Sequence, residues 1–282
     1  MDGKANRAVK DSVFTNLFAR KKYTLELYRA LFPDDTDDLT EDDFEIITLE
    51  NVLMRDIYND LGILVKNKLI LLVEAQSTWS RSITFRMFMY LAGVYKEYIV
   101  EHELDLYTDR VPKLPEPELY VIYTGENKNL PDTLSLADVF FGGKKTVDLN
   151  VKVITNGVNG DIIYQYVAFT RVVNEQIKQH GYTKTAIAET IRICKDENVL
   201  REYLISCEKE VFDMLDVLFD HDFIAKAHDN TVREEGIKEG IKEGALSAFA
   251  GLVKKGMLTI AQAAAEAGMT VPEFQAKTGL NM

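Results

Sequence analysis

Two apolar runs joined by a short polar segment constrain the fold of this chain most. Residues 57–65 and 69–76 are rich in leucine, isoleucine and valine, and only Lys66-Asn67-Lys68 stands between them. Runs of this kind with so short a connection are typical of a β-hairpin. Because the hairpin is apolar on both faces, we expect its strands to lie in the middle of a sheet that is covered on both sides.

The register of this hairpin decides which polar side chains meet. If Lys66-Asn67-Lys68 forms the loop, Val65 pairs with Leu69 and Asp60 lies opposite Glu74. One face then carries Leu61, Ile63, Val65, Leu69, Leu71 and Val73, and the other carries Leu64, Ile70 and Leu72. Residues directly opposite on antiparallel strands have Cβ atoms about 4.5–5.5 Å apart. Gln76 follows Glu74 by two positions and shares its face. A slip of one residue would remove this alignment.

Two carboxylates in such a sheet suggest a metal site. They would repel each other and lose hydration, which is costly unless a cation or a hydrogen-bond donor compensates. Mg²⁺ (or Mn²⁺) would resolve the conflict, since such ions favour carboxylate oxygens and keep water for chemistry. A bound ion could activate water and stabilise charge on a phosphodiester. The spacing alone leaves an alternative open, in which Asp60 and Glu74 are strand-end residues facing solvent or local amides.

The remaining elements place the hairpin in an α/β protein. Apolar spacing predicts helices within residues 11–32 and 80–100, strands at 44–50, 119–123 and 149–154, and helix from about residue 164 to 228. The order helix, three strands, helix, strand is typical of an α/β sandwich around a mixed sheet flanked by helices. We therefore expect a core over residues 1–163, a helical extension packed on it over 164–228, and a helical tail over 229–282.

The tail contains a repeat, Glu235-Gly-Ile-Lys-Glu-Gly-Ile-Lys-Glu-Gly244. Each glycine costs a helix about 1 kcal/mol relative to alanine, so this segment is either marginal or packed closely against a partner helix. Residues 258–278 resemble the core of a helix-turn-helix, but the second helix offers only Lys277 as a base. We expect the C-terminal helices to form a homo-oligomer rather than to read DNA.

Composition narrows the classes of function. A net charge of −12 argues against a general nucleic-acid binder, although eight of the acids fall within residues 34–45, a run typical of a solvated loop. Cys194 and Cys207 form no Cys-x-x-Cys pair and the four histidines are scattered, so zinc and a Cys–His nucleophile are not expected. No apolar run is long enough for a membrane span or an export signal, which predicts a cytoplasmic protein.

Short motifs around the hairpin carry a family resemblance. Asp60-Leu-Gly-Ile-Leu-Val and Leu72-Val-Glu-Ala-Gln-Ser77 closely resemble the recombination-promoting nuclease/putative transposase family (Rpn, YhgA-like). That family is a branch of the PD-(D/E)XK nuclease superfamily. The similarity continues into Ile83-x-x-Arg86-x3-Tyr90 and Asp11-x-x-Phe14-x-x-Leu17-Phe18, and covers roughly residues 8–180.

The resemblance implies a PD-(D/E)XK restriction-endonuclease-like core and an enzyme that hydrolyses phosphodiester bonds in double-stranded DNA with Mg²⁺ or Mn²⁺. It links the chain to DNA recombination or mobile elements. It implies Asp60 and Glu74 as metal ligands, with Gln76 at the position of the signature lysine. Glutamine can orient water or a phosphate oxygen but carries no charge. A further acid usually comes from the first helix, where Asp11 is the candidate and Glu50 the alternative; Asp11 could equally be a helix N-cap.

Residues outside the motif complete these expectations. Arg86 could face the site and bind phosphate, or lie on the surface. Trp79 could stack on a base, although packing is the more common role for such a residue. A DNA-binding rim would draw on three groups of bases: Arg20-Lys21-Lys22, Lys66 with Lys68, and Lys144-Lys145. Two other functions stay open, a catalytically weak or inactive nuclease-fold module that binds DNA and self-associates, and a metal phosphohydrolase acting on small phosphates.

Overall fold

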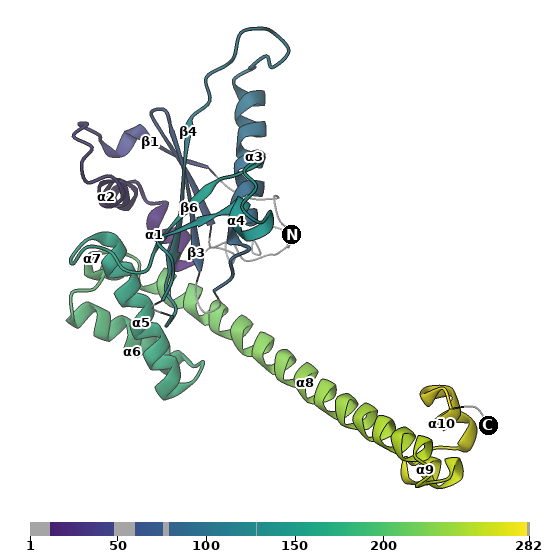
Figure 1. Ribbon diagram of the computed structural model, residues 1–282. Helices are drawn as coiled ribbons and strands as arrows, with labels where there is room; N and C mark the ends of the chain where they lie inside the picture. The colour runs from purple at the N-terminus through teal and green to yellow at the C-terminus, as the bar shows by residue number, and fades with distance from the viewer. Residues whose placement is uncertain (1–11, 48–59, 76–78, 128, 281–282) are drawn as a thin grey trace, which may run out of the picture. The chain divides into compact units, whose positions relative to one another are not determined.

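The computed structural model describes residues 12–47, 60–75, 79–127 and 129–280. For residues 74, 75, 221–236, 238, 239 and 242 it describes the backbone and not the side chain. The chain divides into two compact units, Met1–Phe219 and Asp220–Met282. The first unit is an α/β structure in which helices flank a mixed sheet, and helices follow it to the C-terminus (Figure 1). The expected α/β core with a mixed sheet is confirmed at this level. No helix in the described ranges is long and apolar enough to cross a membrane.

The described residues form a six-stranded sheet of order β1-β2-β3-β4-β6-β5. The strands are β1 Phe44–Ile47, β2 Asp60–Val65, β3 Lys68–Ala75, β4 Glu116–Tyr123, β5 Thr133–Ser135 and β6 Asn150–Ile154. Neighbours β1, β2 and β3 are antiparallel, β3 and β4 are parallel, β4 and β6 are parallel, and β5 returns antiparallel to β6. The hairpin thus adjoins the centre of the sheet, as its apolar composition predicts.

The hairpin register differs from the prediction by one residue. Lys66 and Asn67 alone form the turn, and Lys68 is already part of β3, paired with Val65. Asp60 therefore pairs with Val73, and the predicted pairing of Asp60 with Glu74 is wrong. Turns of two residues suit the twist of antiparallel strands, and Lys66 adopts the positive φ of 53° that such a turn requires.

The one-residue shift also changes which side chains share a face. Odd-numbered positions of β2 share a face with even-numbered positions of β3: Leu61, Ile63, Val65, Ile70 and Leu72 belong to one core cluster. Leu69, Leu71 and Val73 belong to the other, with Leu64 packed against them. The predicted grouping of Leu69, Leu71 and Val73 with Leu61 is thus wrong. Both faces are apolar, so the hydrophobic pattern does not distinguish the two registers.

Helices cover both faces of the sheet (Figure 1). On one face the core is completed by side chains of α1 Val13–Phe18, α2 Lys21–Leu31 and α5 Ile162–His180. On the other face Ile83, Met87, Tyr90 and Val94 of α3 Ile83–Glu101 pack against the sheet. The helices expected within 11–32 and 80–100 are confirmed, whereas β5 and the short α4 Leu136–Phe140 were not anticipated.

The region expected to be helical after residue 164 forms α6 Lys184–Asp196, α7 Arg201–Ser206 and the start of α8 Glu208–Lys254. Ile187, Tyr203 and Phe219 are buried in the same cluster as the first face of the sheet. α5 begins where the Asp161 side chain accepts from the Tyr164 amide and ends at Gly181, whose φ is 68°. Side-chain caps and a left-handed glycine are the ordinary signals that start and stop a helix.

The second unit is a small helical cluster. α8 continues without a break through the glycine repeat, and α9 Ile260–Glu266 and α10 Val271–Thr278 follow it. Ala263, Ala264 and Phe274 are buried there, packed against the last turns of α8 through Phe249 and Val253 among others. The helix before Gly268 and the helix after it are both confirmed, with Gly268 in the left-handed turn at φ 65°.

Candidate functional site

Asp60 is the one buried acidic residue among the residues described, with 7% of its surface exposed. It is the first residue of β2, and its pairing with Val73 puts it beside the face that α3 covers. A carboxylate at such a position must have partners, because burying an uncompensated charge is very costly.

Two side chains of α3 supply those partners. Nη2 of Arg86 donates to both Oδ1 and Oδ2 of Asp60, each at 2.8 Å. The hydroxyl of Tyr90 donates to Oδ2 as well. Arg86 and Tyr90 lie one turn apart on the helix, so both reach the same point on the sheet. The guanidinium carbon of Arg86 also lies 5.9 Å from the centroid of the Tyr90 ring.

The three groups change one another's proton affinity. Burial raises the pKa of Asp60, while the positive charge of Arg86 and the hydrogen bonds from Tyr90 and Arg86 oppose that rise. Burial lowers the pKa of Arg86, but Asp60 and Tyr90 outweigh it, so the guanidinium pKa is raised overall. Burial and the neighbouring Asp60 both raise the pKa of Tyr90. Arg86 is therefore a permanent cation here and Tyr90 a neutral donor.

The other predicted catalytic residues lie at or beyond the limits of the structure. Glu74 belongs to β3, where it pairs with Ile122 of β4, but its side chain is not among those described. Gln76, Asp11 and Glu50 lie outside the described residues. Since side chains alternate along a strand, the observed register gives no support for placing Glu74 on the face of Asp60.

The start of α1 settles one alternative for Asp11. The N-cap of this helix is Ser12, whose side chain accepts from the Thr15 amide. The alternative in which Asp11 caps the helix is therefore wrong.

The donors around Asp60 fit a divalent cation only in part. Its carboxylate has the hard oxygen atoms that Mg²⁺ and Mn²⁺ prefer. However, both oxygens accept hydrogen bonds from Arg86, and no three acidic, histidine or cysteine side chains of the described residues are placed to hold a metal ion. A cation could reach both oxygens of Asp60 only after Arg86 moves away.

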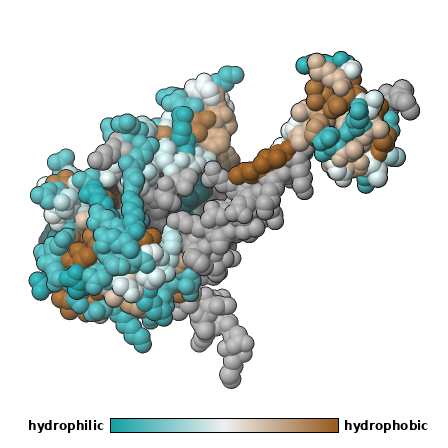
Figure 2. All heavy atoms as spheres, turned by 90° about the horizontal axis from the view of Figure 1, so that it is seen from below, coloured by the Kyte–Doolittle hydropathy of each residue, from teal (hydrophilic) through white to brown (hydrophobic). Residues whose placement is uncertain are grey.

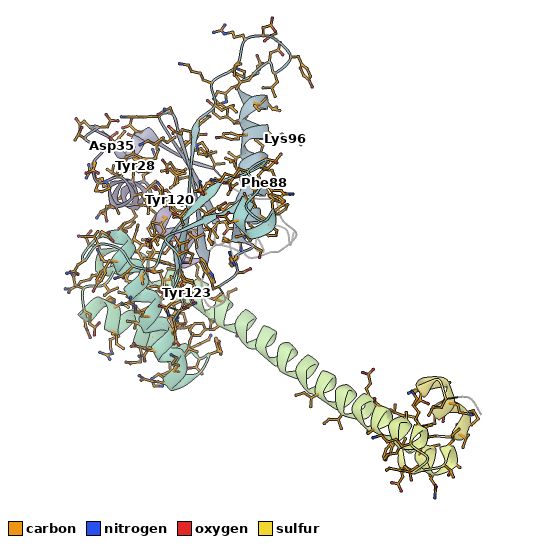
Figure 3. The ribbon with its side chains drawn as sticks, in the orientation of Figure 1. Tyr28, Asp35, Phe88, Lys96, Tyr120 and Tyr123 are labelled. Atoms are coloured by element: carbon orange, nitrogen blue, oxygen red, sulfur yellow. The ribbon has the colours of Figure 1, made fainter. Side chains whose placement is uncertain are left out.

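The neighbouring end of β4 is lined by aromatic side chains. Trp79 meets Tyr123 edge to face, with ring centroids 5.6 Å apart, and packs against the core cluster beneath α3. Tyr123 stands at the last position of β4, beyond Tyr120 in the view of Figure 3. Its hydroxyl accepts from the Asn127 amide at 3.2 Å. Trp79 therefore has a packing role in this structure, the more common of the two roles expected.

Most bases of the expected DNA-binding rim are engaged by acids. The ion pairs are Arg20–Glu210, Lys21–Asp42, Lys22–Glu202, Lys66–Asp37 and Lys68–Asp35. Lys144 and Lys145 are exposed. Exposed ion pairs contribute only about 0–1 kcal/mol to stability, so a polyanion could compete with the acids for these bases. The neighbouring acids nevertheless cancel part of the positive potential of the rim.

Part of the acidic run is bound to Tyr28 and to Lys68, the first residue of β3. The Tyr28 hydroxyl donates to Asp35 at 2.5 Å, and the two residues are neighbours in Figure 3. Lys68 lies 3.2 Å from the Tyr28 hydroxyl and 4.1 Å from the centroid of the Phe32 ring. Within this run Glu41–Asp43 also form a 3₁₀ turn. Residues 35–43 therefore include a 3₁₀ turn and side chains held by hydrogen bonds, and are not simply the solvated loop that was expected.

The sequence places Tyr90 both in the apolar stripe of α3 and in the family-like motif without assigning it a role in the site, and it leaves Arg86 undecided between the site and the surface. The available signal was their spacing of one helical turn in the family-like motif, which puts a guanidinium and a hydroxyl on one inward face. Fold and site together define an α/β protein in which a buried acid and a buried phenol meet a partly exposed guanidinium at the start of a strand. No protein-family model, curated protein or solved structure matches the chain.

Proposed function

We propose that this chain is a divalent-metal-dependent DNA endonuclease with a PD-(D/E)XK restriction-endonuclease-like core, acting in the cytoplasm on double-stranded DNA. The observation that carries the proposal is Asp60, a buried carboxylate at the start of β2, an interior strand of the sheet. It lies beside β3, whose last residues, Glu74 and Ala75, begin the Glu74-Ala-Gln76 motif of the sequence. A buried acid in an otherwise apolar hairpin is unexpected in a purely structural sheet.

The topology supports the same proposal. A helix precedes three antiparallel strands, α3 follows them, and β4 then pairs parallel to β3. This is the order that the family resemblance implies for the core. Association with DNA recombination or mobile elements rests on that resemblance alone.

In this proposal Asp60 is a metal ligand, and the family resemblance implies Glu74 as the second ligand and Asp11 as the additional acid from the front of the chain. Glu74 follows Val73, the partner of Asp60, by one residue, so the two acids would share an ion only around the end of β3. When bound, the ion supplies positive charge at the phosphate and lowers the pKa of a water molecule. Gln76 orients water or a phosphate oxygen. Arg86 exposes 41% of its side chain, so its guanidinium can also face an anionic substrate, for which its planar donors are well suited.

Plasmid nicking tests the proposal directly. Supercoiled plasmid is incubated with the full chain and Mg²⁺ or Mn²⁺, and relaxed and linear forms are separated on gels. We expect cleavage by the unaltered protein and at least a hundredfold loss in Asp60→Asn and Glu74→Gln, a typical cost of removing one charge-stabilising group. Asp132→Asn, an exposed acid distant in sequence from the motif, is the matched control and should cut normally.

A second candidate is a catalytically weak or inactive nuclease-fold module that binds DNA and self-associates. Two observations favour it: Arg86 engages both oxygens of Asp60, and Ile237 and Ile241 of α8 are 53% and 66% exposed. DNA binding by the unaltered protein with no nicking across a series of divalent metals would establish this candidate instead.

A further inference from the structure

The hydrogen bonds of Asp60 put Arg86 where a metal ion would have to be. One nitrogen atom, Nη2, lies 2.8 Å from each carboxylate oxygen, so it bridges them much as a bound cation would. The side chain of Asp60 is 4% exposed. Among the residues described, the one ion pair of Asp60 is with Arg86. The guanidinium is therefore the group that compensates this buried charge, a role that one cation or another must fill.

Arg86 is only partly enclosed, whereas its partner Asp60 is buried. Its Nε is buried and has no hydrogen-bond acceptor, which is unusual because unpaired buried donors cost free energy. Its Nη2 donates to the two oxygens of Asp60, and 41% of the side chain is open to solvent. A long flexible side chain with one buried partner and an open side can leave that partner without any movement of α3.

Tyr90 differs from Arg86 in this respect. Its hydroxyl donates to Oδ2 of Asp60, the residue as a whole is 3% exposed, and it belongs to the core cluster beneath α3. It can therefore keep the carboxylate in place whether or not Arg86 is bound to it.

We propose that Arg86 is the resident counterion of Asp60 and that a divalent cation and Arg86 compete for the same carboxylate. This inference rests on the proposed function, because it requires a cation to bind at Asp60. In the metal-free protein the guanidinium closes the site; when a cation binds, the guanidinium is released toward solvent, where a phosphate group of DNA is its natural acceptor.

Reciprocal coupling follows from this competition. If binding of a phosphate draws Arg86 away from Asp60, the phosphate raises the affinity of Asp60 for the cation. The cation must then raise the affinity of the protein for the phosphate by the same factor. DNA should therefore tighten cation binding in the unaltered protein, and this tightening should disappear when residue 86 has no charge.

Calorimetric titration of the full, chelator-treated chain with Mn²⁺ tests the inference without relying on cleavage. We compare the unaltered protein with Arg86→Met, Arg86→Lys and Asp60→Asn. Arg192→Met is the control, since Arg192 is an exposed residue paired with Glu189 and Asp196. We expect Arg86→Met to bind Mn²⁺ about tenfold more tightly or better, because in the unaltered protein the guanidinium occupies the carboxylate for most of the time and the ion must displace it. Asp60→Asn should lose the binding, and Arg192→Met should match the unaltered protein.

Thermal unfolding supplies a second readout. Without metal, Arg86→Met should melt at a lower temperature than the unaltered protein, because Asp60 is left uncompensated, and Mn²⁺ should raise its melting temperature by the larger amount. If Arg86→Met does not fold, Arg86→Lys replaces it: a lysine is a point charge that bridges the two oxygens less well, so Mn²⁺ should still bind more tightly than in the unaltered protein.

The outcomes distinguish failure of the competition between Arg86 and the cation from failure of the proposed endonuclease function. Equal or weaker Mn²⁺ binding in both Arg86 variants, with metal-dependent nicking by the unaltered protein, overturns the competition and leaves the endonuclease intact. Absence of Mn²⁺ binding in every variant, together with absence of nicking, overturns the metal-dependent function and the competition with it.

Discussion

Asp60 and Arg86 join the first residue of β2 to the helix that covers that face of the sheet. The contact is short and charged, and it lies at the edge of an apolar layer formed by Leu71, Val73 and Met87. Together with the hydrogen bond from Tyr90, this ion pair joins α3 to the sheet and forms the candidate site. Its contribution to stability and to function can be measured one group at a time.

Tyr90→Phe removes the hydroxyl that donates to Asp60 and leaves the ring in the core. We expect the free energy of unfolding to fall by about 1.5–3 kcal/mol, the usual range for a hydrogen bond to a charged group. Urea unfolding followed by circular dichroism measures this loss.

Tyr95→Phe is the matched control for Tyr90→Phe on the same helix. The Tyr95 hydroxyl donates to the carbonyl of Pro115, a neutral acceptor, so its loss should cost only about 0.5–1.5 kcal/mol. Equal losses in the two variants would show that Asp60 is not the charged acceptor of Tyr90.

The hairpin register can be checked in solution by NMR. We expect strong cross-strand proton contacts between the backbones of Leu64 and Leu69 and between Gly62 and Leu71, the pairs of the observed register. Directly opposite backbones approach to about 4.5–5.5 Å between Cα atoms, which such contacts report. Contacts that instead join Val65 to Leu69 would restore the alternative register and, with it, the pairing of Asp60 with Glu74.

Much of the fold follows from local sequence patterns. Amphipathic spacing predicts α3, and the apolar runs predict β2, β3, β4 and β6, because each pattern reports the period of its element. The short β5 and α4 leave too few residues for any period to stand out. The glycine repeat predicts a weak helix, yet α8 runs through it unbroken, since local propensity is easily overridden by the helix on either side.

The site itself could be predicted only in part. Motif resemblance singles out Asp60, but the register depends on a turn in which Lys66, a residue without special preference for positive φ, takes that conformation. The pairing of Asp60 with Arg86 joins residues of a strand and a later helix, and depends on how α3 lies on the sheet. Such a tertiary contact leaves no periodic trace in the sequence.

Asp35 gives a prediction about pH. Its pKa is lowered to about 2, first by the hydrogen bond from Tyr28 and then by the Asp37 amide and Lys68. An acid whose pKa is lower in the folded protein than in the unfolded chain, where it is about 3.9, stabilises the fold above that value. The stabilisation is lost as the pH falls from about 4 through about 2. Asp35→Asn should therefore be less stable at neutral pH, with the difference vanishing near pH 2 in urea unfolding.

NMR titration of the side-chain carboxyl carbons isolates the cause. Tyr28→Phe should raise the pKa of Asp35 toward its ordinary value and leave unchanged the lowered pKa of Asp43, which depends on hydrogen bonds from Thr40. A shift of both acids, or of neither, would contradict the assigned role of Tyr28.

Phe274 tests whether the C-terminal cluster is a unit of its own. It is fully buried among Ala263, Ala264 and the last turns of α8. Phe274→Ala should cost about 3–5 kcal/mol, enough to unfold so small a cluster. Hydrogen exchange should then become fast across residues 258–280 and stay unchanged in the sheet. Val271→Ala, which alters a 37% exposed residue of the same helix, is the control and should leave exchange slow.

The exposed face of α8 tests self-association. Ile237 and Ile241 lie one turn apart and are mostly exposed, and a Cβ atom added at Gly240 or Gly244 would meet nothing within 4 Å among the described atoms. Figure 2 shows apolar residues at the surface of the protein. A helix from a second copy that packs on this face would cover the isoleucines. The glycines, which have no Cβ atom, would let the two backbones approach closely. Light scattering of the unaltered chain should therefore give a mass above 32.0 kDa, and Ile237→Ser with Ile241→Ser should return it to the monomer. Met257→Ser, a 69% exposed apolar residue beyond the end of α8, should not change the mass. A monomeric unaltered chain at high concentration would exclude assembly through this face.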